Sequence, residues 1–257
     1  MSRRDSVLRE MGLGPLWRLR EAPPEAVAPR IAVSPAPTFQ AVAQPLAPTL
    51  AAAEGRGAAI AGMGWDELRA TVAGCDACML CRERRQAVLG VGDVDADWLF
   101  VGEGPGAEED ERGEPFVGQA GKLLDAMLAA IDLRRGADVY IANAVKCRPP
   151  GNRTPQPEET AACWPYLERQ IALIRPKLIV ALGKPAAQTL LQAEVKVGES
   201  RGRLFDFKGI PLIVTYHPAY LLRSLADKAK AWEDLCFMRR TMKQLQEQDT
   251  AHPGCSV

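Results

Sequence analysis

The segment WLFVGEGPG, residues 98–106, joins a run of apolar residues to a loop rich in glycine. The apolar part, Trp98 to Val101, has the length and composition of a buried strand. Further runs of this kind follow along the chain, at residues 139–145, 178–182 and 212–216. Segments with a helical pattern accompany them, at residues 123–131, 157–174 and 226–246. Strands that alternate with helices predict a parallel sheet covered by helices on both faces.

Three unusual loops directly follow these predicted strands. They lie at residues 102–110, 146–154 and 217–223. In a parallel sheet the functional loops lie beyond the carboxyl ends of the strands, at one edge. Three unusual segments at that edge indicate an active site more strongly than any one of them does.

The composition is that of a globular protein with one enzyme-sized domain. The chain has 257 residues, 47% of them hydrophobic and 25% charged, and its formal net charge is zero. Global charge therefore neither favours nor excludes nucleic acid, because a groove needs only a local basic patch. No apolar run approaches the ~18 residues of a membrane span, and charged residues interrupt the N-terminal segment where a secretory signal is apolar. We expect a cytoplasmic, monomeric protein that does not enter a membrane.

The N-terminal part of the chain differs from the rest. Residues 21–62 are dense in Ala and Pro, which is typical of a disordered linker. In front of them, residues 1–20 carry leucines and Trp17 among basic residues and are predicted to be a short partner-docking peptide. The predicted globular domain spans residues 63–246, and residues 247–257 are predicted to be a disordered tail.

The spacing of the cysteines indicates a metal site. Cys75 and Cys78 are three positions apart, so that one turn can bring both thiolates to a metal, and Cys147 and Cys163 can complete a set of four. Spacing alone does not separate zinc from a 4Fe-4S cluster, and the alternative is that the two downstream cysteines are small buried hydrophobic residues. Cys81 makes the pattern ambiguous, because with Cys75 and Cys78 it resembles the start of a bacterial ferredoxin run.

The glycine loop and two polar residues are candidates for a ligand site. Glycines let backbone approach a ligand closely, but the third glycine comes too early for a dinucleotide motif and Glu103 would repel a pyrophosphate. His217 directly follows a predicted strand, which makes a functional role as plausible as a structural one. Asn143 lies inside an apolar strand, where its amide needs partners from the core or from a ligand.

Taken in order, these motifs resemble family 4 of the uracil-DNA glycosylases, the iron-sulfur branch of that superfamily. The resemblance covers residues 65–245 and rests on Cys75-x2-Cys78, residues 102–110, PFVG at 115–118, NAVKCRPP at 143–150, NRTP at 152–155, Cys163 and residues 217–223. It implies a three-layer α/β/α fold with a central four-stranded, mainly parallel sheet, and uracil-containing DNA as the substrate. It also implies that Cys75, Cys78, Cys147 and Cys163 hold a 4Fe-4S cluster, whereas Cys81 matches a position that is not a ligand.

The resemblance further implies how the base is bound. A base inside a duplex is unreachable, so that the enzyme must extrude it into a pocket that reads its edge and holds its face. Phe116 would stack on the ring, and the Asn143 amide would donate to uracil O4 and accept from N3-H, a pattern that cytosine reverses. Glu109 would lie towards C5, where it crowds out the thymine methyl. The remaining candidates for substrate binding are Gly104 and Asp110.

Cleavage of the glycosidic bond leaves negative charge on uracil and positive charge on the sugar. His217 is the candidate donor to uracil O2, and Glu103, with the backbone of the glycine loop, is the candidate for orienting water and stabilising the sugar cation. The candidates for DNA contact are the wedge residues Leu221 and Leu222, the phosphate-binding Arg223, and Arg148 and Arg153 in the loop after Cys147.

A second resemblance covers only residues 2–20. SRRDSVLREMGLGPLWRLR is similar to the N-terminal peptide of the psi subunit of bacterial DNA polymerase III, which docks on the clamp loader. Two other functions therefore compete with the DNA repair hydrolase: a non-catalytic replisome subunit that keeps the glycosylase fold, and an iron-sulfur oxidoreductase. The first of these predicts loss of the pocket residues, which are all present. The second predicts an acid about 20 residues beyond the glycines, where leucines stand instead.

Overall fold

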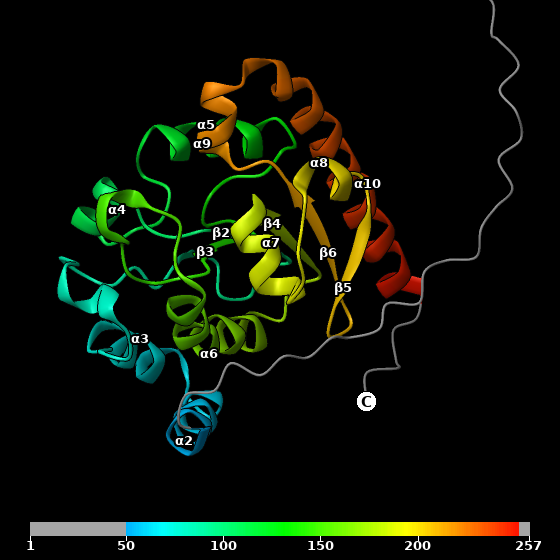
Figure 1. Ribbon diagram of the computed structural model, residues 1–257. Coiled ribbons are helices and arrows are strands. Elements are labelled where there is room, and N and C mark those ends of the chain that lie inside the picture. The colour runs from blue at the N-terminus through cyan, green and yellow to red at the C-terminus, as the bar shows by residue number, and fades with distance from the viewer. Residues whose placement is uncertain (1–49, 252–257) are drawn as a thin grey trace, which may run out of the picture. The chain divides into compact units, whose positions relative to one another are not determined.

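A twisted sheet of six strands forms the centre of the domain (Figure 1). This computed structural model describes residues 50–251, with side chains described for residues 55–248. The strand order is β1-β3-β2-β4-β6-β5. Their bounds are β1 Val91–Gly92, β2 Trp98–Gly102, β3 Val139–Asn143, β4 Leu178–Leu182, β5 Leu204–Phe207 and β6 Ile210–Thr215. The four inner strands are parallel, as the sequence predicted, and β1 and β5 extend them antiparallel at the two edges.

Helices cover both faces of the sheet. Their bounds are α2 Leu50–Ala61, α3 Trp65–Ala73, α4 Ala107–Arg112, α5 Gln119–Ala129, α6 Pro157–Ile174, α7 Lys184–Leu191, α8 Val197–Ser200, α9 Pro218–Arg223 and α10 Lys228–Ala251. Three short 3₁₀ helices are η1 Met79–Arg82, η2 Pro150–Asn152 and η3 Leu225–Asp227. None of these described helices is both long enough and apolar enough to cross a bilayer.

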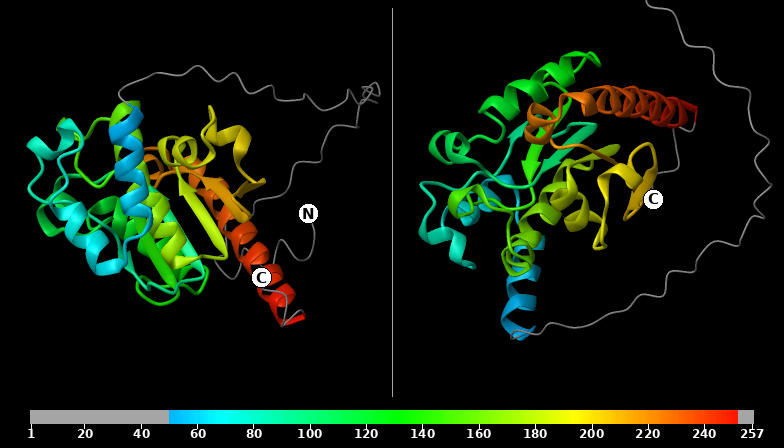
Figure 2. Two further views of the ribbon diagram at one scale, coloured as in Figure 1. Left: turned by 90° about the horizontal axis from the view of Figure 1, so that it is seen from below. Right: turned by 45° about the horizontal axis from the view of Figure 1, so that its top comes forward.

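Alternation along β2 shows why the inner strands are continuously apolar. Trp98 and Phe100 pack on one face, in a core completed by α5, α9 and α10. Leu99 and Val101 pack on the other face, against α6 and α7. In the right-hand view of Figure 2, α5 and α10 lie on the side of the sheet opposite to α6 and α7. Both faces are covered, so that every position of such a strand favours an apolar residue, and the predicted three-layer fold is confirmed.

Helix α6 begins and ends where the sequence predicted. Pro157 occupies its first turn, where a missing N–H costs nothing. The Glu159 carboxylate accepts a hydrogen bond from the Gln156 amide at 2.8 Å, which caps the start of the helix. At the other end Arg175 adopts a left-handed conformation, with φ 53°, and stops it.

The limits of the domain differ from the predicted ones. Residues 50–61, placed in the linker because of their alanines, form helix α2. Helix α10 continues to Ala251, beyond the predicted start of the tail at 247. Alanine-rich sequence has high helix propensity as well as low hydrophobicity. Composition alone therefore did not distinguish a helix from a disordered linker. The docking peptide and the first part of the linker lie outside the described residues.

Candidate functional site

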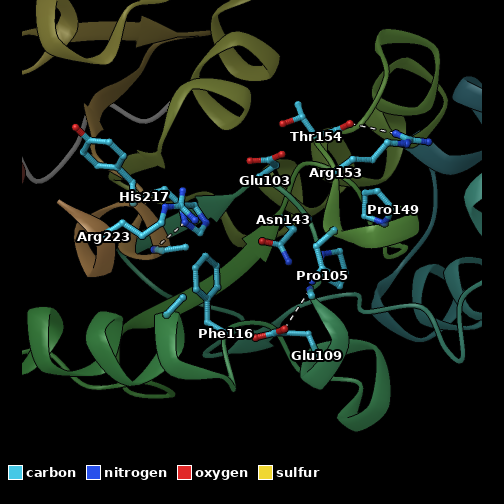
Figure 3. Close-up of a pocket in the computed structure, with 16 residues that line it drawn as sticks. Glu103, Pro105, Glu109, Phe116, Asn143, Pro149, Arg153, Thr154, His217 and Arg223 are labelled. Carbon is cyan, nitrogen blue, oxygen red and sulfur yellow. Dashed lines mark hydrogen bonds between the residues drawn. The ribbon is translucent and has the colours of Figure 1, made fainter.

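A cavity of about 500 Å³ opens at the carboxyl edge of the sheet. The loops after β2, β3 and β6 all contribute to it, as expected for a parallel sheet. In Figure 3 the side chains of Glu103, Asn143, Phe116 and His217 surround the same space. The predicted site residues that the cavity brings together are Glu103, Gly104, Glu109, Phe116, Asn143, Arg153, His217 and Arg223.

Gly102 makes room for the centre of this cavity. It pairs with Asn143 across the parallel strands β2 and β3. A Cβ at position 102 would lie 2.4 Å from Asn143 Oδ1 and 2.5 Å from Phe116 Cζ, distances at which atoms overlap. Only glycine therefore allows the amide and the aromatic ring to meet at the end of β2.

Asn143 carries a buried acceptor that no protein group satisfies. Its side chain is 2% exposed, and Oδ1 has no hydrogen-bond partner among the described residues. An unpaired buried acceptor costs about 1–3 kcal/mol, so that a ligand with a matching N–H recovers that free energy. The backbone behind it is fixed, because the buried Lys146 ammonium donates to the Asn143 carbonyl at 2.8 Å.

Phe116 is held in a conformation that a bulky residue rarely adopts. Its φ is 56°, in the left-handed region. Arg135 donates to the carbonyls of Pro115 and Phe116, both at 2.7 Å, and so fixes the backbone before and after the Phe116 Cα. Gly121 in α5 lets the helix approach, since a Cβ there would lie 1.7 Å from the Phe116 carbonyl oxygen.

Gly102, Gly121 and Arg135 shape the site without having been predicted as part of it. Gly121 was detectable in principle, because a glycine inside a helical pattern usually has a packing reason. Nothing in the sequence around Arg135 indicates its contacts, which depend on the chain returning to the Phe116 turn.

Glu109 connects the two loops that border the cavity. One carboxylate oxygen accepts from the amides of Val117 and Gly118 at 3.0 and 3.1 Å, and the other accepts from Gly106 at 3.1 Å. Three amide donors satisfy much of the acceptor capacity of the carboxylate. Its first effect is therefore to fix the glycine loop against the Phe116 turn.

His217 is the N-terminal cap of α9 and faces Phe116. Its Nδ1 accepts a hydrogen bond from the Ala219 amide at 3.1 Å, so that in the neutral ring the proton resides on Nε2. The ring centroids of His217 and Phe116 are 5.4 Å apart. Burial, helped by the nearby charge of Arg223, lowers the pKa of His217 to about 4. A neutral imidazole that donates through Nε2 is therefore the form present near pH 7.

Glu103, on the glycine loop, lies beside Thr154, and both residues line the cavity (Figure 3). Burial raises the pKa of Glu103 above its usual value, and a hydrogen bond with the Thr154 side chain opposes that rise. The hydroxyl thus supports the ionised form of a carboxylate that its surroundings disfavour.

Two predicted site residues point away from the cavity. Asp110 is buried and accepts hydrogen bonds from the backbone amides of Arg85 and Gln86, so that it anchors the segment after η1 instead of binding substrate. Its neighbour Glu109 faces the cavity, and consecutive helical residues point in different directions. Leu221 is 1% exposed and packs in the core with α5 and α10, which excludes it as a wedge.

The remaining predicted DNA contacts lie at or near the rim. Leu222 is 41% exposed, and Arg223 lines the cavity. Arg153 also lines the cavity, but its guanidinium binds both oxygens of Glu159 at 2.6 and 2.8 Å. Arg148 donates to Asn152 Oδ1 at 2.7 Å and lies outside the lining of the cavity.

The predicted metal ligands border a second, smaller cavity. It is lined by Cys75, Cys78, Cys81, Cys147 and Cys163. Within residues 55–248 no three His, Cys, Asp or Glu side chains converge in the manner of a single-ion site. The cysteines instead surround a common space, which suits a cofactor that takes one thiolate at each of several irons.

Hydrogen bonds to sulfur distinguish four of these five cysteines. Each sulfur accepts from one N–H donor: Cys75 from the Arg56 guanidinium (3.7 Å), Cys147 from the Arg84 guanidinium (2.9 Å), Cys163 from the Lys146 backbone amide (3.2 Å), and Cys78 from the Leu80 backbone amide. In the described part of the chain the Cys81 sulfur has no donor of this kind. N–H groups directed at sulfur stabilise thiolate ligands. The chemistry of the donor set therefore fits the four cysteines inferred from the sequence.

Comparison with known proteins gives one consistent family. Residues 89–236 match the uracil DNA glycosylase superfamily. The chain is 43% identical to the type-4 uracil-DNA glycosylase of Pyrobaculum aerophilum over 182 residues, which covers 67% of this chain and 92% of that protein. It is 48% identical to the type-4 uracil-DNA glycosylase of Thermotoga maritima over 158 residues, 61% of this chain and 82% of that protein. A type-5 uracil-DNA glycosylase of Thermus thermophilus is 38% identical over 118 residues, 40% and 53% of the two chains.

Proposed function

Because this chain belongs to the uracil-DNA glycosylase superfamily, and within it to the type 4 enzymes, we propose that the cavity around Asn143 is where it binds uracil and releases it from DNA. The chain is a hydrolase of N-glycosyl bonds that excises uracil. One observation supports this location above the others: a buried acceptor, Asn143 Oδ1, faces a cavity bordered by an aromatic ring and a neutral imidazole. A non-catalytic replisome subunit would not need this arrangement.

Asn143 and Phe116 read the extruded base. The Phe116 ring packs on one face of uracil, and Asn143 Oδ1 accepts from N3-H while the amide nitrogen donates to O4. Cytosine presents an acceptor and a donor in the reverse order, so that both contacts become unfavourable. Lys146 contributes by fixing the backbone of Asn143, which keeps the side-chain amide of Asn143 in one position in the cavity.

His217 and Glu103 act on the two charges that develop as the bond breaks. The His217 Nε2–H donates to uracil O2, where negative charge accumulates, and it does so without a change of protonation state. Glu103 is directed at the sugar side, where an ionised carboxylate stabilises the developing cation and orients the attacking water. Thr154 helps to keep Glu103 ionised. Glu109 is close enough to C5 in this arrangement to crowd out the methyl group of thymine.

Residues at the rim of the cavity contact the DNA. Leu222 is exposed and fills the gap left by the extruded base, and Arg223 neutralises phosphate beside it. Arg148 and Arg153 lie on the loop after Cys147 and supply further positive charge.

The residues that would hold a 4Fe-4S cluster are Cys75, Cys78, Cys147 and Cys163, and the donors to the four sulfurs support this ligand set. With Cys147 and Cys163 engaged as ligands, both ends of the segment 147–163 would be fixed. Pro149, Asn152 and Thr154 of the same segment line the base cavity. The ligand set would therefore support the shape of that cavity.

The N-terminal peptide, residues 1–20, binds the clamp loader of the replicative polymerase. Its similarity to the psi peptide supports this role, and it would keep the enzyme near newly made DNA in the cytoplasm, where uracil is misincorporated. This part of the chain lies outside the described residues, and its role rests on sequence alone.

The experiment that tests the base site is the substitution Asn143→Asp. Its carboxylate accepts from the cytosine amino group and lacks the donor for uracil O4. We expect the ratio of excision rates for uracil over cytosine to fall by about 100-fold, which corresponds to roughly 3 kcal/mol for a hydrogen bond to a charged group. Single-turnover rates on oligonucleotides that carry either base measure this ratio.

Asn152→Asp is the matched control. It makes the same change of charge at the exposed mouth of the cavity, and it should leave the ratio unchanged. A ratio that stays the same in Asn143→Asp would place the base elsewhere.

A further inference from the structure

Helix α2 lies outside the segment that matches the superfamily, which begins at residue 89. It packs against α6, the helix that carries Cys163, and Figure 1 shows it near α3 and α6. The base cavity described above is lined by no residue from the described part of α2. Its position next to the cysteine cavity therefore requires a separate explanation.

The apolar contact of α2 is made with the surroundings of the cysteines. Ile60 is 1% exposed, although most of its neighbours in α2 are exposed. It packs in a small core that also contains Cys147, Cys163 and Tyr166. Burial of this isoleucine side chain is favourable and holds one end of the short helix in place.

Arg56 makes the polar contact of α2. Its guanidinium donates to the Ala162 carbonyl at 2.8 Å and to Cys75 Sγ at 3.7 Å. It lies over the Tyr166 ring, with 4.8 Å between Cζ and the ring centroid. One side chain thus connects the residue before Cys163 to the sulfur of Cys75.

This contact falls on the less protected side of the cysteine cavity. Cys147 and Cys163 are buried, whereas Cys75 and Cys78 are partly exposed. Arg84 donates to Cys147 from within the segment that follows η1. Arg56 is the described cation that donates to a sulfur on the partly exposed side, and it comes from an element that the sequence pattern assigns to a linker.

We propose that helix α2 is a cover for the iron-sulfur site, fastened by Ile60 and by Arg56, and that it prolongs the lifetime of the cluster. The inference rests on the proposed cluster. Arg56 limits access to Cys75 and supplies positive charge to a thiolate ligand, and both effects slow ligand exchange and loss of iron. The cover has no part in base recognition.

The test uses full-length protein purified without oxygen. Iron content and visible absorbance are measured first, and then the rate at which the absorbance fades in air-saturated buffer. Arg56→Ala and Ile60→Ala should start with the same iron content as the unchanged protein and should lose absorbance about tenfold faster, the lower end of the effect of outer-shell partners on metal sites. Excision of uracil by freshly prepared protein should be equal in all three.

Arg69→Ala is the matched control, because Arg69 is an exposed arginine on α3 that pairs with Asp66. It should fade at the unchanged rate. Equal fading of Arg56→Ala, Ile60→Ala and the unchanged protein would overturn the cover. An effect of Arg56→Ala without one of Ile60→Ala would also overturn it, since a hydrogen bond to sulfur would then act without the helix. Unchanged protein prepared without oxygen that holds no iron would refute the cluster itself, which is a separate failure.

Discussion

Gly102 and Asn143 stand side by side on neighbouring strands, and this pairing determines what the cavity binds. The glycine leaves the space, and the amide places an unpaired acceptor in it. The free energy of that acceptor is recovered only by a ligand whose donor reaches the same point. In the proposed mode of binding, selection for uracil follows from the position of this oxygen atom.

His217→Ala should slow uracil release by on the order of 10²-fold, the usual cost of losing one donor to an oxyanion. DNA binding should persist, because the donor acts mainly in the transition state. Single-turnover rates and a binding titration with uncleaved DNA measure the two effects. An unchanged single-turnover rate would remove His217 from the mechanism.

The pKa of His217 also makes a prediction about pH. Its folded-state pKa of about 4 lies below the unfolded value near 6.5, so that the unfolded chain binds a proton more readily between these values. The contribution of His217 to stability is therefore complete above pH 6.5 and declines as the pH falls towards 4. His217→Gln should reduce the loss of unfolding free energy between pH 6.5 and 4.5, measured by denaturant titration at each pH. A loss equal to that of the unchanged protein would contradict the low pKa.

Thr154→Val should move the acidic limb of the rate profile to higher pH. The hydroxyl opposes the effect of burial on the pKa of Glu103, so that its removal lets the carboxyl protonate at a higher pH and lose its negative charge earlier. Excision rates measured from pH 4 to pH 8 test this. Thr154→Ser should restore the original limb.

Two other carboxylates at or near this cavity are bound within the protein, Glu159 by Arg153 and Glu109 by three backbone amides. Thr160→Val, a threonine of α6 outside the lining of this cavity, is the control and should leave the limb in place. If the acidic limb of the rate profile does not move in Thr154→Val, the Thr154 hydroxyl does not lower the pKa of Glu103.

The sequence indicated the polar side chains that line the cavity better than the residues that hold the Phe116 turn in place. Glu103 and His217 follow predicted strands and Asn143 is the last residue of β3. The carboxyl ends of parallel strands meet at one edge of the sheet. Arg135 and Gly121 act through contacts with a turn far away in the sequence, which no local pattern contains.

Two adjacent leucines of helix α9 lie in opposite environments. Leu221 faces the core and Leu222 faces solvent, because successive side chains of a helix point about 100° apart. No local pattern distinguishes the two positions, since both are leucine and the helix is only six residues long.

Leu222→Ala should slow excision from duplex DNA more than from single strands, where no stacked partner has to be displaced. The ratio of the two single-turnover rates measures the effect. Leu204→Ala, an exposed leucine on β5, is the control. Leu221→Ala should instead lower the unfolding free energy by about 2–5 kcal/mol, as for other core truncations. Equal effects of Leu222→Ala on both substrates would exclude a wedge.

Among the elements, the inner strands and α6 were predictable and the edges were not. Burial on both faces makes the inner strands continuously apolar, and proline with acids marks the start of α6. Strand β1 has two residues and β5 is half exposed, so that neither has a distinct pattern. Helix α2 depends on contacts with the cysteine site that composition does not reveal.

At the scale of the whole chain, the N-terminal peptide should determine location but not catalysis. Trp17→Ala and removal of residues 1–20 should leave excision from free oligonucleotides unchanged and should abolish binding to the clamp loader, because aromatic and aliphatic anchors dominate peptide docking. Titration of the clamp-loader complex with the three proteins is the measurement. Equal affinity of all three would contradict the tether.

The base cavity and the cysteine site share the segment between Cys147 and Cys163. Two sites that depend on the order of one segment are thermodynamically linked. If occupancy of the cysteine site strengthens base binding by some free energy, base binding strengthens occupancy of the cysteine site by the same amount. This holds because the states with neither, either or both sites occupied form a closed thermodynamic cycle. Where the proposed cluster strengthens base binding, protein bound to damaged DNA should therefore lose its iron more slowly than free protein does.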